Sequence, residues 1–139
     1  MNYLLDTNVI SELVSSKPNP NVISWIEQIP FHAFYLSVLT LGEIRKGIEQ
    51  VKDPKRKKKL LIWLEHELNE TFAERILSIS IPIADRWGRL QSEAKRTLPA
   101  IDSLIAATAL HHDMALVTRN TMDFSYCPGL EIINPWDKF

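Results

Sequence analysis

Residues 3–8 of the chain read YLLDTN, a short apolar run that stops at a carboxylate. The run Tyr-Leu-Leu predicts a brief buried strand, and Asp6 directly after it places a polar side chain at the end of that strand. Asn8 is a residue type that caps helices, so it predicts a short helix that continues to about Leu13. The stretch therefore predicts a strand followed at once by a helix, as in α/β proteins.

The same alternation of short apolar runs and longer amphipathic segments continues along the chain. Further strands are predicted at four apolar runs: 33–37, 76–79, 115–118 and 131–133. Helices are predicted over 22–29, 40–51, from Asp53-Pro54 through Leu68, 82–96 and 101–112. This order predicts a single domain over residues 1–139, α/β in class, with a mainly parallel central sheet flanked by helices.

Composition excludes several classes of protein. The single cysteine, Cys127, excludes an internal disulfide framework and a cysteine-rich zinc site. No apolar run is long enough to span a membrane and no signal-peptide pattern is present, so we expect a cytoplasmic protein without a membrane partner. The net charge of −1 does not suit a protein that simply coats nucleic acid. Any action on nucleic acid must depend on local basic patches around a site.

Four carboxylates fall where the predicted strands end or the following helices begin. Asp6 follows the first strand, Glu43 lies early in the helix after the second, and Asp102 lies in the first turn of its helix. Asp123 comes five residues after Thr118, at the end of the fourth predicted strand. Ligands of open α/β sheets bind at the carboxyl ends of the strands, so the sequence predicts that these four acids gather at one edge.

Carboxylates held close together repel one another, and a divalent cation relieves that repulsion. An all-oxygen ligand set suits Mg²⁺, with Mn²⁺ as a substitute, and such ions assist the hydrolysis of phosphodiesters. Any one of these acids taken alone has a simpler interpretation as a helix cap or a solvated surface group. Asp102, for example, is well placed to favour a helix dipole.

Four segments then resemble a known family when taken in order. They are LLDTNVISE at 4–12, SVLTLGEI at 37–44, PAIDSLIAA at 99–107 and VTRNTMDF at 117–124. Together they resemble the PIN domain, and specifically the VapC/FitB-type toxins of prokaryotic type II toxin–antitoxin pairs. The resemblance implies a PIN-like three-layer fold and a Mg²⁺-dependent endoribonuclease. It also implies homodimers, a cognate VapB/FitA-like antitoxin, and larger assemblies with that antitoxin.

The resemblance also assigns roles to individual residues. Asp6 and Asp102 are expected to bind the metal directly, and Glu43 and Asp123 are expected to complete the shell, directly or through water. Three further side chains at the same edge are expected to orient the ligands or water, namely Thr7, Thr118 and Asn120. For the two threonines a local interpretation stays open, in which each hydroxyl only binds nearby backbone.

Two other functions compete with a ribonuclease. An aspartyl phosphatase needs a second acid two residues after the first, but that position is Asn8. A non-catalytic acidic pocket that binds nucleic acid or a basic peptide remains the main alternative. The segment Lys52–Lys59, KDPKRKKK, is the most basic stretch and is either an RNA contact or a solvated helix face. An antitoxin is expected to insert an arginine or lysine among the four acids, since a guanidinium pairs well with carboxylates.

Overall fold

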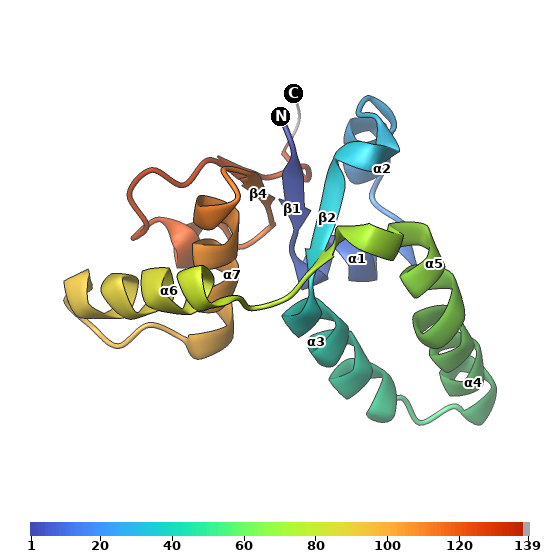
Figure 1. Cartoon of the computed structure of the whole chain (residues 1–139). Helices are drawn as coiled ribbons and strands as arrows, with labels where there is room; N and C mark the ends of the chain where they lie inside the picture. The colour runs from blue at the N-terminus through green and yellow to red at the C-terminus, as the bar shows by residue number, and fades with distance from the viewer. Residues whose placement is uncertain (138–139) are drawn as a thin grey trace.

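The computed structural model describes residues 1–137, and a five-stranded parallel sheet forms its centre (Figure 1). The strands run in the order β3-β2-β1-β4-β5. Their bounds are β1 Tyr3–Leu5, β2 Phe34–Ser37, β3 Ile76–Leu77, β4 Ala115–Val117 and β5 Ile132–Ile133. In the central strand, Leu4 is in register with Tyr35 of β2 and Leu116 of β4. All five strands coincide with predicted ones, although β3 has only two of the four residues expected.

Helices connect successive strands and pack on both faces of the sheet (Figure 1). The α-helices are α1 Thr7–Leu13, α2 Pro20–Glu27, α3 Val38–Glu49, α4 Pro54–Ile62, α5 Asn69–Phe72, α6 Ile81–Glu93 and α7 Ala100–His111. A π-helical segment, η2 Trp63–Leu68, joins α4 to α5. Short 3₁₀ turns lie at η1 Phe31–Ala33, η3 Ala73–Arg75 and η4 Thr121–Phe124.

The sheet is buried on both sides: neighbouring strand residues point to opposite faces, and an apolar core packs against each face. Leu4 and Leu116 belong to a core formed with α6 and α7, whereas Leu5 and Val117 belong to a second core. That second core includes residues of α1, α3, η2 and α5. The two cores explain why the strands read as continuous apolar runs. They also confirm the predicted three-layer α/β architecture.

Helix boundaries differ from the predictions at two informative places. The N-cap of α1 is Asp6 and not Asn8, because the Asp6 carboxylate accepts the backbone N–H of Thr7 at 2.8 Å. Helix α6 ends at Glu93, three residues before the predicted end near Arg96. There the Gln91 side chain binds both the N–H and the carbonyl of Leu98, which turns the chain back toward α7.

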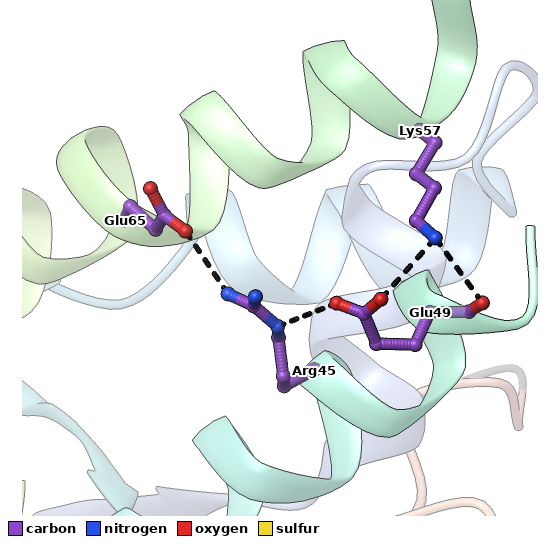
Figure 2. Close-up of polar contacts among 4 residues, drawn as sticks. All are labelled: Arg45, Glu49, Lys57 and Glu65. Carbon is purple, nitrogen blue, oxygen red and sulfur yellow. Dashed lines mark hydrogen bonds and ion pairs between the residues drawn. The ribbon is translucent and has the colours of Figure 1, made fainter. Parts of the chain in front are cut away.

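Helix α4 begins as predicted, with Asp53 as the N-cap and Pro54 as the first helical residue. A network of charged side chains joins α4 and η2 to α3 (Figure 2). Arg45 binds Glu49 and Glu65, each at 2.9 Å, and Lys57 binds Glu49 at 3.2 Å. These side chains are between one third and one half exposed, so each pair contributes modestly to stability. No helix within residues 1–137 has both the length and the apolar composition needed to cross a membrane.

Arg75 connects the end of the long helical segment to the sheet edge. Its guanidinium donates to the carbonyls of Phe31 and Phe34 at 2.7 Å and to that of Thr71 at 2.8 Å. It also lies over the rings of Phe31 and Phe72, at 5.0 and 5.4 Å from their centroids. One side chain thus joins β2, η1 and α5.

We expect Arg75→Ala to lower the free energy of unfolding by about 2–3 kcal/mol, because hydrogen bonds to a charged donor are the stronger ones. Arg75→Lys should recover only part of this loss, since an ammonium group cannot reproduce the planar set of N–H donors of the guanidinium. Urea unfolding of the purified variants measures the effect. Arg89→Ala is the matched control: Arg89 is exposed and, within residues 1–137, forms an ion pair only with Asp85 on its own helix, so its loss should cost less than about 0.5 kcal/mol. Equal losses for Arg75→Ala and Arg89→Ala would contradict this account.

Candidate active site

The carboxyl ends of β1, β2 and β4 lie together where α1 and α3 begin (Figure 1). A cavity of about 470 Å³ opens at this edge. Its walls are formed by Asp6, Thr7, Asn8, Ser11, Glu12, Ser15, Glu43, Asp102, Arg119, Asn120 and Trp136. We call it the acid cavity. Five of the seven predicted site residues line it, and they come from β1–α1, α3, α7 and the segment after β4.

Asp6 occupies the end of the central strand and is only 5% exposed. Its backbone N–H donates to the carbonyl of Val117 at 2.9 Å, which continues the ladder between β1 and β4. One carboxylate oxygen accepts the N–H of Thr7, and the other accepts the hydroxyl of Thr118 at 2.8 Å. The carboxylate is therefore held in one orientation by groups on both neighbouring segments.

Thr118 is fully buried and receives several donors around its hydroxyl. The side-chain amide of Asn8 lies 3.2 Å from the Thr118 oxygen, and the backbone N–H of Asn120 donates to it at 3.0 Å. Because these groups donate to Thr118, its own proton is directed to Asp6. The predicted alternative, in which the Thr118 hydroxyl binds only nearby backbone, is incomplete. The hydroxyl accepts the N–H of Asn120 but also donates to Asp6.

Glu43 approaches the same cavity from the first turns of α3. Its Oε1 atom accepts the hydroxyl of Thr7 at 2.6 Å, so the threonine contacts a carboxylate 36 positions away and not merely nearby backbone. Within residues 1–137, the other oxygen of Glu43 accepts no hydrogen bond from protein groups. It is therefore available to a ligand in the cavity.

Asp102 and Asp123 differ in their position relative to the acid cavity. Asp102 lies in the first turn of α7, is partly buried and lines the cavity. Asp123 lies in η4, is exposed and does not belong to the cavity wall. Its negative charge nevertheless raises the pKa of both Asp6 and Asp102. The structure thus brings three of the four acids into one cavity and leaves the fourth at its margin.

The acids make ionisation of one another harder. Burial is the largest influence on Asp6 and raises its pKa, the hydrogen bonds from Thr118 and Thr7 oppose that rise, and the charges of Glu43 and Asp123 add to it. The pKa of Asp102 is raised first by burial and then by the charges of the other three acids. A cation among them would stabilise every ionised carboxylate.

The chemistry of this donor set fits a hard divalent cation, since every acidic group at the cavity offers carboxylate oxygen. Within the described part of the chain, however, no three acidic, histidine or cysteine side chains converge closely enough to hold an ion as they stand. Two observations are consistent with the separation of these acids. Ionised acids repel one another, and Glu43 is bound by the Thr7 hydroxyl. Binding an ion requires these side chains to move closer together.

Sequence reasoning missed six of the eleven residues that line this cavity, and Asn8, Arg119 and Trp136 are three of them. Asn8 was interpreted as a helix cap, but its amide contacts Asp6 and Thr118, and its oxygen accepts the N–H of Arg119 at 3.3 Å. Arg119 lies over the ring of Trp136 at 5.4 Å from the centroid, on the wall of the acid cavity. The position of Arg119 between Thr118 and Asn120 was an available signal, whereas nothing in the sequence placed Trp136 here.

Comparison with known proteins gives matches along nearly the whole chain. The model of the PIN domain family matches residues 3–127. Toxin FitB of Neisseria gonorrhoeae is 37% identical over 136 residues, spanning 96% of this chain and 97% of its own. A VapC ribonuclease of Sinorhizobium fredii is 36% identical over 137 residues, with 96% and 97% covered.

Solved structures agree with the sequence comparisons. The crystal structure of FitAcB from Neisseria gonorrhoeae superimposes with a TM-score of 0.91 at 36% identity, covering 98% of this chain and 99% of the other. A toxin–antitoxin complex from Klebsiella pneumoniae matches with a TM-score of 0.72 at 30% identity, covering 99% and 100%. Family model, relatives and structures all extend over nearly the whole chain, and the chain therefore belongs to the PIN domain family.

Proposed function

We propose that this chain is a Mg²⁺-dependent endoribonuclease and the toxin of a type II toxin–antitoxin pair. The observation that carries the proposal is the acid cavity, where Asp6, Glu43 and Asp102 from three separate elements line one space. The relatives named as a toxin and as a ribonuclease support the same activity. A cluster of acids without a cation would repel an RNA backbone, so the proposal requires a metal.

In this proposal Asp6 and Asp102 bind the cation directly, and Glu43 and Asp123 complete the shell directly or through water. A divalent cation at such a site makes water more acidic and stabilises the negative charge that develops on the phosphate. The Mn²⁺ ion has similar ligand preferences and is expected to substitute.

The chain's own residues prepare this site. Asp6 Oδ1 accepts the N–H of Thr7 at 2.8 Å, and Oδ2 accepts the Thr118 hydroxyl at 2.8 Å and, more weakly, the Asn8 amide at 3.5 Å. Oδ1 therefore keeps a second lone pair for a ligand. Asn8 supports the Thr118 hydroxyl and thereby maintains the direction of its bond to Asp6. Thr7 holds Glu43 at the cavity wall, and Asn120, the residue before η4, lines the same cavity.

The proposed partners follow from the same family. The solved toxin–antitoxin complex supports a cognate antitoxin for this chain, of VapB/FitA type. We include a homodimer of this chain, in larger assemblies with the antitoxin, in the proposal. The acid cavity offers the antitoxin a place for a cationic side chain.

Metal dependence tests the proposal directly. Purified protein incubated with mixed RNA should cleave it when Mg²⁺ or Mn²⁺ is present and should stop when EDTA is in excess. Gel analysis of the RNA measures both states. Undiminished cleavage in excess EDTA, in a preparation free of other nucleases, would exclude a metal-dependent site. Binding of RNA without cleavage under any metal condition would favour the non-catalytic acidic pocket.

Asp102→Asn isolates the role of charge in the cavity. It should lower cleavage by on the order of 100-fold or more, because even residues that only support metal ligands cost 10–100-fold. Asp102 is a cleaner choice than Asp6, because the NH2 group of an amide at position 6 would face one of the two donors there, the Thr7 N–H or the Thr118 hydroxyl. Asp85→Asn, an exposed acid on α6, is the matched control and should keep full activity. Equal activity of Asp102→Asn and wild type at equal concentration would contradict the assignment.

The same variant should be more stable than wild type when no metal is present. Folding raises the pKa of Asp102 above its ordinary value of 3.8, so ionisation of this carboxyl destabilises the folded state. The folded state of the wild type therefore loses stability as the pH rises from 3.8 through the raised pKa. In EDTA at pH 7.5, Asp102→Asn should therefore melt a few degrees above wild type. The difference should shrink as the pH falls toward 4. A lower melting temperature for the variant at pH 7.5 would show that the acids do not repel as described.

The antitoxin partner gives a further test. Truncation of its inserted arginine or lysine to alanine should relieve inhibition of cleavage, because that side chain occupies the cavity that binds the metal. Inhibition assays with the purified pair, alongside a measurement of complex formation, separate the two effects. Unchanged inhibition in an intact complex would mean that the antitoxin acts by covering the site from outside.

A further inference from the structure

An RNA strand must reach the acid cavity in spite of the negative charge there. The net charge of the whole chain is −1, so it does not attract an RNA backbone. Attraction must come from a local group of cations. The segment Lys52–Lys59, at the start of α4, contains six basic residues and is the strongest concentration of positive charge in the sequence.

These six cations are not equivalent. Lys57 is directed toward α3, where its ammonium group binds the carboxylate of Glu49 at 3.2 Å and the carbonyl of the same residue at 3.4 Å (Figure 2). Arg45 binds the other carboxylate oxygen of Glu49 (Figure 2). The remaining five cations of the segment are exposed and form no ion pair with any residue in 1–137: Lys52, Lys55, Arg56, Lys58 and Lys59.

Two further cavities connect the acid cavity to this part of α4. The middle cavity, of about 190 Å³, shares three wall residues with the acid cavity, namely Thr7, Ser11 and Glu43. The outer cavity, of about 480 Å³, shares Val14, Arg56, Leu60 and Trp63 with the middle cavity. The three cavities therefore adjoin one another in a row from the acids to the start of α4, and we call this row the channel.

The α4 side of the channel combines positive charge with an aromatic ring. Arg56, Leu60 and Trp63 are four and three residues apart, so they follow one face of the helix, and Trp63 is partly buried. Lys55 and Lys59 line the outer cavity beside them. Among the described residues Asp53 is the one acid of that outer wall, and its carboxylate accepts the N–H of Lys55 as the helix cap.

We propose that this channel binds single-stranded RNA, with Arg56, Lys55 and Lys59 on the phosphates and Trp63 against a base, so that the strand continues into the acid cavity. Single-stranded nucleic acids bind where cations follow the backbone and an aromatic side chain offers a stacking surface. The excess of positive charge on the α4 wall favours a polyanion over a peptide as the occupant. The inference rests on the proposed ribonuclease activity and names the surface that its substrate uses.

Binding in EDTA tests the channel separately from cleavage. The probe is a fluorescein-labelled oligouridine of 12 nucleotides, and fluorescence anisotropy with the full chain gives the Kd across a series of salt concentrations. Arg56→Ala should raise the Kd by about 5–10-fold at 50 mM salt, and one lost phosphate contact should reduce the salt slope by about 0.7. Lys59→Ala should behave in the same way.

Lys58→Ala is the matched control. It removes one positive charge from the same helix, but Lys58 lines none of the three cavities, so its Kd should change by less than about twofold. Arg56→Lys keeps the charge and should retain most of the affinity. Circular dichroism and melting temperature establish that α4 remains folded in each variant.

The outcomes separate the inference from the proposed function. Equal losses for Arg56→Ala and Lys58→Ala would show diffuse attraction and overturn the channel, as would no loss in either. If RNA affinity stays constant while Arg56→Ala weakens binding of the antitoxin, the channel holds the protein partner instead. In Mg²⁺, Arg56→Ala should raise KM with kcat unchanged. A chain that binds oligouridine through Arg56 yet cleaves no RNA would keep the channel and refute the ribonuclease.

Discussion

Asp6 joins the central strand, the first helix and the candidate site through one residue. Its N–H continues the ladder to Val117 of β4, while its carboxylate caps α1 and accepts the Thr118 hydroxyl. Burial of such a carboxylate is costly unless hydrogen bonds compensate it. The two strands, the start of α1 and the segment after β4 must therefore keep their relative positions for this residue to be tolerated.

The charge distribution of the molecule follows from that arrangement. Acids gather at the carboxyl edge of the sheet, where burial and mutual repulsion raise the pKa of Asp6 and Asp102. Cations gather on α4, where Lys57 alone among the Lys52–Lys59 segment is paired within residues 1–137. The Arg45–Glu49–Lys57 contacts connect α4 to α3 (Figure 2). This connection holds the cationic helix beside the middle cavity, which adjoins the acid cavity.

Most of the fold could be predicted from local sequence patterns. Short apolar runs marked all five strands, because a strand buried on both faces needs apolar residues at every position. Asp53 and Pro54 marked the start of α4 through their intrinsic preferences. The N-cap of α1 was wrongly assigned to Asn8, since both Asp and Asn are good caps and only the observed bond to the Thr7 N–H distinguishes them. The π-helical segment at Trp63–Leu68 had no signal in the periodicity of its leucines, which fits an α-helix nearly as well.

The sequence by itself determined the family and the acidic character of the cavity. Four ordered motifs carry the acids, and their places after strands and at helix starts direct them to one edge of a parallel sheet. Tertiary structure alone decided how those acids are arranged. It leaves Asp123 outside the cavity wall, directs the Thr118 hydroxyl to a carboxylate 112 positions away, and brings Arg119 and Trp136 into the same wall. It also places two further cavities between the acid cavity and α4. Such contacts depend on how distant segments pack against one another, and local sequence preferences contain no information on that packing.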